Sequence, residues 1–313
     1  MLQSLRKFLF GAPDTGDRQV HESLPQLAYK YTSAQWLESI VTEGLFAFPG
    51  IDRLNDPHES AFDATAEQLL SENSIPQHTG DLRERDLIQV RIGSMRDFLE
   101  NPYAEKYRRE RIERDMAALR KRNEEIDQIN RQRGETRTAL ARARTEIGVL
   151  ALTRRRCHVL MWAHYGQNSS GLCVGLDISD PGIAAYAPSA SGWDDSSDLF
   201  RPQSIVYGSE VPHYWHAATR DIVRAAFFTK SREWSYEAEV RILRPVRDKD
   251  AVSTGPVALF RFPKRAITEV LLGPAALPET VKLATQLATR SDAPRFFRVE
   301  VSSTSYALHV RPL

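Results

Sequence analysis

Hydrophobic residues recur along the 313-residue chain in two patterns, one typical of helices and one typical of strands. Within residues 27–44, an apolar run is followed by apolar positions at helical spacing. Thr32 or Ser33 would supply the oxygen that caps this helix, and Gly44 fits the left-handed position after its last turn. The pattern therefore predicts a short strand at Leu27–Tyr31 and a helix that ends at Gly44.

The second half of the chain contains many short apolar runs bounded by turn residues, a pattern that predicts strands. The predicted strands are Gly171–Ile178, Gln203–Tyr207, Glu237–Leu243, Val257–Phe262, Ile267–Leu272, Arg295–Val301 and Tyr306–Val310. Helical spacing predicts helices at Leu160–Gly166 and at about His216–Phe228. Together these elements predict an α+β fold with a mostly antiparallel sheet and helical insertions.

A highly charged segment separates these two parts of the chain. Residues 105–145 contain thirteen Lys or Arg and eight Asp or Glu. One apolar stripe runs through them and predicts a helical hairpin or two successive helices, with a break at Gly134. The stripe consists of Ile112, Met116, Leu119, Ile126 and Ile129.

Two interpretations of the charged segment stay open. The first is a solvated, salt-bridged pair of helices that packs on the domain. The second is an arm that binds nucleic acid or an acidic partner, because the basic excess continues into residues 154–156. In the second interpretation the candidate nucleic-acid-binding residues are Arg108, Arg109, Arg120 and Lys121.

Composition is that of an ordinary soluble globular protein, with 42% hydrophobic residues, 27% charged residues and a net charge of +1. No apolar run approaches the ~20 residues of a membrane span, and residues 1–26 lack a signal-peptide core. We therefore expect a cytoplasmic protein without a membrane partner. Its predicted organisation is an N-terminal segment, 1–26, and one domain, 27–313, interrupted by the charged helical insertion at about 82–150.

The stretch REWSYEAEVRIL contains two glutamates, Glu237 and Glu239, at a spacing of two. In an extended strand they would share a face and lie only ~6–7 Å apart, so they would repel each other unless a cationic or protic group lay between them. One interpretation is an ion-pair motif on a solvent-facing strand, with Arg241, Arg232 or Lys230 as partners. The other interpretation is a pair of catalytic carboxylates.

Other patterns are less specific. His158 and His164 have no cysteine in register, which argues against zinc. The chain has no phosphate-binding Gly-rich motif and no Gly-x-Ser-x-Gly elbow. The turn that begins at Asn55 either closes over a ligand phosphate or ribose or is simply a turn. Lys230 and Arg232 are better placed for a pyrophosphate.

Four phrases in fixed order, followed by ITEVLLGP, carry a family resemblance over most of residues 27–275. They are YKYTS, LNDPHES, MWAHYGQNSSGLCVGLD and FFTKSREWSYEAEVRI. The combination resembles the bacterial family known as domain of unknown function 2971.

A more distant resemblance suggests a mechanism. A strand with polar or aromatic residues, a helix and a late Glu-x-Glu strand are similar to the layout of ADP-ribosyltransferases, especially those that modify DNA. The resemblance implies an ADP-ribosyltransferase-like split sheet and NAD as substrate. Its first motif falls on Lys30, flanked by Tyr29 and Tyr31, although the family usually has Arg or His there. Its last motif falls on Glu239, with Glu237 as the other half of the pair.

The middle motif of that family has no clean match in this sequence, and Trp162, His164 and Tyr165 are our candidates for it. The candidate cofactor-binding set is completed by Asn55 and by three residues that precede the glutamates, namely Lys230, Trp234 and Tyr236.

Elementary chemistry agrees with the assignment of the glutamates. Cleavage of the nicotinamide bond develops positive charge on the ribose, which a carboxylate stabilises in the transition state. Glu239 would stabilise this charge, and Glu237 would orient or deprotonate the acceptor. We expect an NAD-consuming mono-ADP-ribosyltransferase, such as a toxin or phage-defence effector, that modifies nucleic acid or protein. The alternatives are an NAD glycohydrolase that uses the same pocket and a non-catalytic module that binds nucleic acid or protein.

Overall fold

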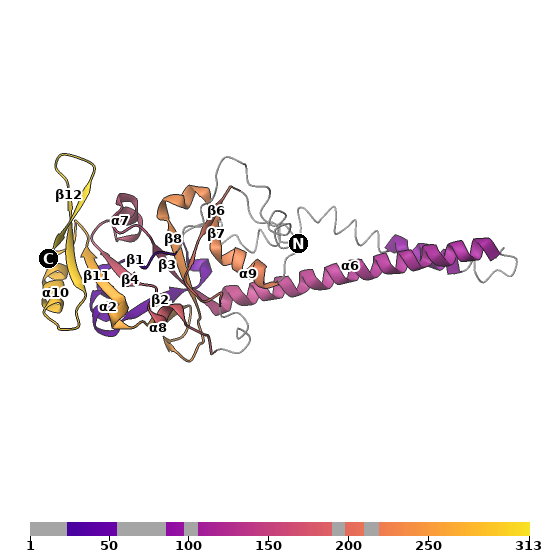
Figure 1. Cartoon of the computed structure of the whole chain (residues 1–313), viewed down its shortest axis with the longest axis horizontal. Coiled ribbons are helices and arrows are strands. Elements are labelled where there is room, and N and C mark those ends of the chain that lie inside the picture. Colours follow the sequence, from indigo (N-terminus) through magenta and orange to yellow (C-terminus); the bar gives the residue numbers. More distant parts are fainter. Residues whose placement is uncertain (1–23, 55–85, 97–105, 190–197, 210–218) are drawn as a thin grey trace. The chain divides into compact units, whose positions relative to one another are not determined.

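The computed structural model describes residues 24–54, 86–96, 106–189, 198–209 and 219–313. The chain forms two compact units, whose helices and strands are drawn in Figure 1. The first unit contains residues 1–60, 143–212 and 224–313, and the second contains residues 61–142 and 213–223. Within the described residues, no helix combines the length and the apolar character that crossing a membrane requires.

The first unit is built on an eight-stranded sheet of order β13-β12-β11-β4-β1-β3-β8-β5. Neighbouring strands are antiparallel except β11 and β12, which are parallel and are joined through helix α10 (Pro278–Ala288). The strands are β1 (Leu27–Thr32), β3 (Ile147–Thr153), β4 (Leu172–Asp177), β5 (Gln203–Ser204), β8 (Glu239–Pro245), β11 (Ile267–Leu272), β12 (Arg295–Val301) and β13 (Leu308–Pro312). The predicted α+β class with a mostly antiparallel sheet is therefore confirmed.

Smaller elements complete the first unit. A second sheet has the order β2-β10-β9, and a third consists of the parallel pair β6 and β7. Their strands are β2 (Leu45–Pro49), β6 (Val206–Gly208), β7 (Thr229–Ser231), β9 (Ala251–Ser253) and β10 (Val257–Arg261). The helices are α2 (Leu37–Glu43), α7 (Val159–Tyr165) and α8 (Pro181–Ala184), with 3₁₀ turns η1 (Ala34–Trp36), η2 (Ile51–Arg53), η4 (Arg232–Glu237) and η5 (Lys264–Ala266). Helix α9 (Thr219–Phe228) is divided between the units, with residues 219–223 in the second and 224–228 in the first.

The main sheet separates two hydrophobic cores. On one face, strand side chains pack with α2, α10 and the second sheet. On the other face, Tyr29 and Tyr31 of β1 pack with Met161 and Trp162 of α7. Figure 1 shows α7 on the opposite side of β1 and β4 from α2. This arrangement follows from the two-residue period of a strand, which turns alternate side chains of β1 to opposite faces.

Strands β1 and β3 are neighbours, but they pair at a single position, Tyr29 with Thr153. In contrast, β3 pairs with β8 along seven positions, and β1 pairs with β4 along six. Where β1 and β3 part, the Lys30 amine donates a hydrogen bond to the carbonyl oxygen of Ala151 at 3.1 Å. A side chain thus satisfies a strand carbonyl there, and the parting of the strands leaves room for a cleft.

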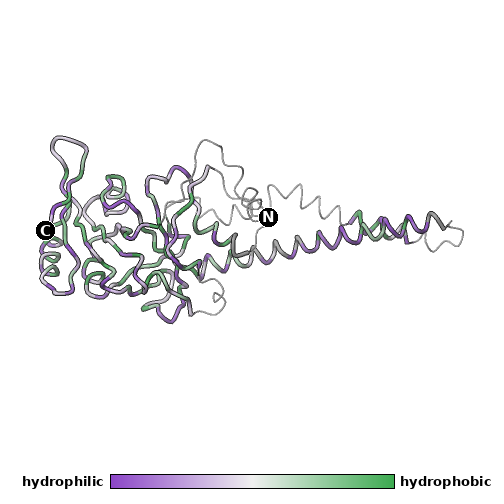
Figure 2. Tube along the Cα trace, viewed as in Figure 1, coloured by the Kyte–Doolittle hydropathy of each residue, from purple (hydrophilic) through white to green (hydrophobic). Residues whose placement is uncertain are grey.

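The second unit contains most of the long helix α6 (Lys106–Glu146) and a helical segment at residues 86–96. Ile88 and Ile92 of that segment pack against the predicted apolar stripe of α6, including Met116 and Ile126. Hydrophilic residues dominate the remainder of α6 in Figure 2. The predicted stripe is confirmed for these positions, while the side chain of Ile129 lies outside the described residues.

Several local predictions are wrong. α6 is continuous through Gly134, because one glycine costs a helix only ~1 kcal/mol relative to alanine and good helix formers flank it. Ser33 makes no side-chain capping bond, since a 3₁₀ turn precedes α2. The predicted strand Gln203–Tyr207 divides at Ile205, so that β5 pairs with β8 while β6 pairs with β7.

Candidate active site

The cleft lies at the parting of β1 and β3 and contains about 420 Å³ of open space, part of it continuous with solvent. Its walls come from β1, β3, α7 and the turn before β8, and Leu54 lines it as well. The lining residues are Tyr29, Lys30, Tyr31, Leu54, Ala151, Leu152, Thr153, Met161, Tyr165, Glu237 and Glu239. Both glutamates that the sequence singled out therefore reach one cleft together with Lys30.

The two glutamates do not share a strand, which corrects the predicted strand start at Glu237. Glu237 ends the 3₁₀ turn η4, and Glu239 begins β8. Ala238 between them adopts a left-handed conformation, with φ 45° and ψ 52°. A left-handed residue costs an L-amino acid roughly 1–2 kcal/mol, so the surrounding structure must impose it. The backbone turn, and not the period of a strand, brings the two carboxylates together.

Three hydrogen bonds to backbone groups hold this turn in place, and two of them involve side-chain hydroxyls. The Thr153 hydroxyl donates to the carbonyl oxygen of Glu237, and the Arg154 N–H donates to that of Ala238 at 3.0 Å. The Glu239 N–H donates to the Tyr207 hydroxyl at 2.8 Å. The turn is thus fixed from β3 on one side and from β6 on the other.

Lys230 of β7 bridges the two carboxylates. Its amine lies 2.7 Å from Oε2 of Glu237 and 3.1 Å from Oε2 of Glu239. Arg241 forms a second ion pair, with Nε 2.6 Å from Oε1 of Glu239 and Nη2 3.3 Å from Oε2. The side chains of all four residues are at most 4% exposed. Their charges sum to zero, as burial of ionised groups requires.

The interpretation of a surface ion-pair motif is therefore right about two of its partners and wrong about exposure. Lys230 and Arg241 pair with the glutamates, as that interpretation proposed. The glutamates, however, are buried and line a cleft instead of facing open solvent. A repulsive pair is tolerated because a cation lies between its members.

Protonation follows from this arrangement. Burial by itself raises the pKa of Glu239, but the charges of Arg241 and Lys230 outweigh burial and hold that pKa below its ordinary value. Burial lowers the pKa of the Lys30 amine, and the charge of Glu239 opposes this shift only in part. Glu239 is thus an ionised carboxylate at neutral pH, and Lys30 gives up its proton more readily than an exposed lysine.

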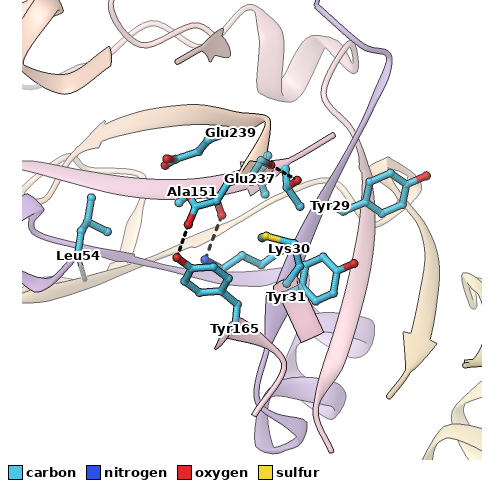
Figure 3. A pocket seen from close by; sticks show the side chains of 11 residues that line it. Tyr29, Lys30, Tyr31, Leu54, Ala151, Tyr165, Glu237 and Glu239 are labelled. Carbon is cyan, nitrogen blue, oxygen red and sulfur yellow. Dashed lines mark hydrogen bonds between the residues drawn. The ribbon is translucent and has the colours of Figure 1, made fainter. Parts of the chain in front are cut away.

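Tyr165 connects α7 to the glutamates by donating its hydroxyl hydrogen to Oε1 of Glu237. Figure 3 shows this bond beside the bond from Lys30 to Ala151. In the same view the rings of Tyr29 and Tyr31 point away from the glutamates. Tyr31 packs edge to face against Trp162, with ring centroids 4.9 Å apart. Lys30 and Tyr165 therefore present polar atoms to the cleft, while these other rings pack in the core.

The remaining predicted site residues fall in different places. Trp162 is 1% exposed and packs in the core beneath the cleft. His164, Trp234 and Tyr236 gather in a half-buried to exposed cluster of rings next to Glu237. Asn55 lies outside the described residues.

The four candidate nucleic-acid-binding residues are all on α6, and the side chain of Arg108 is outside the described part. Arg109 is half-buried, and Arg120 and Lys121 are exposed. These positions lie in the second unit, whereas the cleft belongs to the first.

Sequence reasoning missed the groups that position the glutamates. Thr153 and Tyr207 act through their hydroxyls from strands distant in sequence, and Ala151 acts through a backbone carbonyl. The sequence offers one weak signal for these groups, which is the polar Thr153 at the end of an apolar run.

Among the described residues, no group of three or more His, Cys, Asp or Glu side chains is arranged to hold a metal ion. No family model, curated protein or solved structure matches the chain. The family resemblances therefore stay predictions, and the cleft is the feature of the molecule that bears on function.

Proposed function

We propose that the protein is an NAD-consuming mono-ADP-ribosyltransferase with an ADP-ribosyltransferase-like fold, and that the cleft between β1 and β3 binds NAD. The observation that carries the proposal is the pair of buried carboxylates, Glu237 and Glu239, on the wall of this cleft. The main sheet is mostly antiparallel, and its neighbouring strands β1 and β3 pair at a single position. Both features support the proposed ADP-ribosyltransferase-like fold.

The hydrogen bonds of Glu239 suit it to stabilise developing positive charge. Its oxygens accept from Lys230 and twice from Arg241, which leaves part of their capacity of about four hydrogen bonds for a ribose hydroxyl. The lowered pKa keeps this carboxylate ionised over the physiological range. A fixed negative charge aimed at a cationic transition state accelerates the reaction without reorganisation.

The charge balance of the cleft favours a ligand with phosphates. Lys230 and Arg241 neutralise the two glutamates, so a cationic nicotinamide ring is not needed to keep them apart. Lys30 adds a further amine to the lining of the cleft. A protonated Lys30 would make the cleft net positive, which suits the pyrophosphate of NAD.

In the proposed reaction the bond between C1′ of the ribose and the ring nitrogen of nicotinamide breaks. Both bonding electrons leave with nicotinamide, whose ring thereby becomes neutral. A lone pair of the acceptor then forms a bond to C1′, and the acceptor proton passes to the Glu237 carboxylate. Tyr165 and Lys230 hold Glu237 in place for this general-base role.

The test is nicotinamide release from NAD by the wild-type protein and by Glu239→Gln, with DNA, RNA or protein present as acceptor. We expect Glu239→Gln to reduce release by about 10²–10³, the usual cost of removing one charge-stabilising group. Glu300→Gln, on the exposed part of β12, is the matched control and should keep full activity. Thermal melting of each variant establishes that the fold is intact.

The outcomes separate the possible functions. Label from NAD that stays on an acceptor supports the transferase, and Glu237→Gln should then reduce transfer more than hydrolysis. Release without a labelled acceptor indicates an NAD glycohydrolase that uses water. Equal release by wild type and Glu239→Gln would contradict the assignment of Glu239, and no release from any mixture would favour a non-catalytic binding module.

A further inference from the structure

Five aromatic rings form a continuous cluster beside the cleft. They come from the α7 segment (His158, His164 and Tyr165) and from η4 (Trp234 and Tyr236). Tyr236 is its centre, with ring centroids 6.2 Å from His158, 6.5 Å from His164 and 6.2 Å from Trp234. The His164 and Tyr165 centroids are 6.2 Å apart. We call these five residues the aromatic rim.

The aromatic rim differs from the aromatic core beneath it. Its rings are half-buried, and His164 is exposed. Tyr31 and Trp162, by contrast, are 4% and 1% exposed. The planes of His158 and Tyr236 are inclined by only 17°, so they present nearly parallel faces. Tyr165 and Tyr236 also pack on that core, and the exposed parts of the rings offer faces on which a flat ligand can stack.

The aromatic rim adjoins the catalytic carboxylates of the proposed function. Tyr165 donates its hydroxyl hydrogen to Glu237, and Tyr236 directly precedes Glu237 in the chain. The Lys230 amine, which bridges the two glutamates, lies 4.9 Å from the centre of the Trp234 ring. A group stacked on the aromatic rim would therefore lie next to the proposed general base.

Cations flank the aromatic rim in sequence. Residues 154–158 and 231–236 together carry four arginines and one glutamate, Glu233. Arg155 and Arg232 are exposed, whereas Arg156 is engaged by the buried Glu269 at 2.7 Å. Arginines interleaved with aromatic rings are the combination that tracks a phosphate backbone while bases stack. An acidic peptide would make use of the charges, but its carboxylates would not stack on a row of ring faces.

We propose that the aromatic rim is the acceptor site of the enzyme and that it binds single-stranded nucleic acid by stacking on unpaired bases. This inference rests on the proposed transferase function, whose acceptor it names. A base in a duplex is not accessible for such stacking, so the acceptor is a single strand, loop or end. DNA and RNA share this chemistry, and the experiment distinguishes them.

The first measurement is fluorescence anisotropy of labelled twelve-nucleotide DNA and RNA strands, without NAD, against an abasic strand of the same length. The abasic strand keeps the phosphates and lacks the bases. We expect His164→Ala and Tyr236→Ala to weaken binding of base-containing strands about fivefold to a hundredfold, as loss of one base–aromatic stack does. Tyr236→Phe keeps the ring and should bind as wild type does.

Tyr306→Ala is the matched control, because Tyr306 is a fully exposed aromatic residue between β12 and β13 and is not part of the rim. It should leave binding unchanged. His164 is exposed, so its replacement tests the inference even if Tyr236→Ala, which also packs on the core, fails to fold. Equal binding of the abasic strand, or equal weakening by Tyr306→Ala, would overturn the inference.

A second measurement, of nicotinamide release and labelling from NAD, distinguishes failure of this inference from failure of the proposed function. Strand binding without nicotinamide release would refute the transferase activity and leave the stacking site standing. Nicotinamide release with label on protein, and no binding of either strand, would overturn the acceptor site alone. Stronger binding and labelling of one polymer would identify it as the acceptor.

Discussion

Charged residues are abundant both at the cleft and along α6, but their surroundings differ. At the cleft, the side chains of Glu237, Glu239, Lys230 and Arg241 are at most 4% exposed and bonded to one another. On α6, the pair Arg122 and Glu125 is 3.7 Å apart, with both side chains nearly half exposed. The same residue types therefore carry different energetic weight, because water replaces a lost partner on α6 and cannot do so in the buried cluster.

The two regions differ in how strictly the positions of their charged side chains are constrained. A buried ion pair costs desolvation, so its partners and its geometry must be fixed together. At the cleft this demand is met by Arg241, Lys230 and the hydroxyl of Tyr165. Along α6 the charges need only remain in water, and many arrangements serve equally well. The comparison can be tested by removing comparable charges from each region.

The largest expected effect is that of Lys230→Met. Removal of the shared cation leaves two buried carboxylates with Arg241 as their remaining ion-pair partner, which should destabilise the fold by about 3–5 kcal/mol. Chemical denaturation at neutral pH measures this loss. Lys249→Met, at an exposed position, is the control and should change stability by less than about 0.5 kcal/mol. Similar losses in both variants would remove the distinction between buried and solvated charge.

Wild type and Lys230→Met should also differ in how their stability depends on pH. The folded pKa of Glu239 lies below its ordinary value of 4.5, so its stabilising effect is present above that value. This stabilisation is lost as the pH falls through the folded pKa. In Lys230→Met the pKa of Glu239 should rise, because one of its two cations is gone. The stability difference between wild type and variant should therefore be largest at neutral pH and should narrow as the pH falls below 4.5, through the folded pKa of Glu239.

A smaller effect is expected at the turn that sets the two glutamates. Glycine at position 238 would remove the left-handed strain of Ala238, whose φ is 45°, and would also increase the freedom of the unfolded chain. These terms oppose each other, so Ala238→Gly should change the free energy of unfolding by less than about 1 kcal/mol. Its activity should fall if the rigid turn positions the carboxylates. Unchanged nicotinamide release in a well-folded variant would show that the strain has no role in the site.

The smallest effect on stability is expected on α6. Replacement of Arg109, Arg120 and Lys121 by alanine should change the free energy of unfolding by less than about 0.5 kcal/mol at each site. Alanine is a strong helix former, and water solvates the neighbouring charges. Nucleic-acid affinity at several salt concentrations tests the second interpretation of this helix. A weaker affinity with a flatter salt dependence would assign phosphate contacts to α6, and unchanged values would leave it a structural role.

Much of the fold was readable in the sequence because its signals are local. The strands at residues 267–272 and 295–301 have the predicted bounds, since uninterrupted β-rich runs there are bounded by turn residues. Gly44 is left-handed, as expected for a residue after the last helical turn. Strand β3 was missed, because its apolar run directly follows the charged helix, and the short β2, β7 and β9 were missed as well.

For the candidate site, the sequence singled out several of the residues that the structure brings together. Glu237, Glu239, Lys30 and Tyr165 were chosen from their types and their motifs, and the structure brings all of them to one cleft. The sequence also offered Lys230 in two roles, as a phosphate contact and as an ion-pair partner. The choice between these roles depends on burial, which no local pattern specifies.

Only the tertiary structure decided how the glutamates meet. A spacing of two suggested one face of a strand, whereas a left-handed Ala238 turns the chain between a 3₁₀ turn and β8. Thr153 and Tyr207 hold this turn from strands 84 and 32 residues away. The sequence by itself determined the residue types and the class of fold, because these follow from local propensity and periodicity. The buried charge network was decided by long-range packing, because the energy of a buried charge depends on every group that surrounds it.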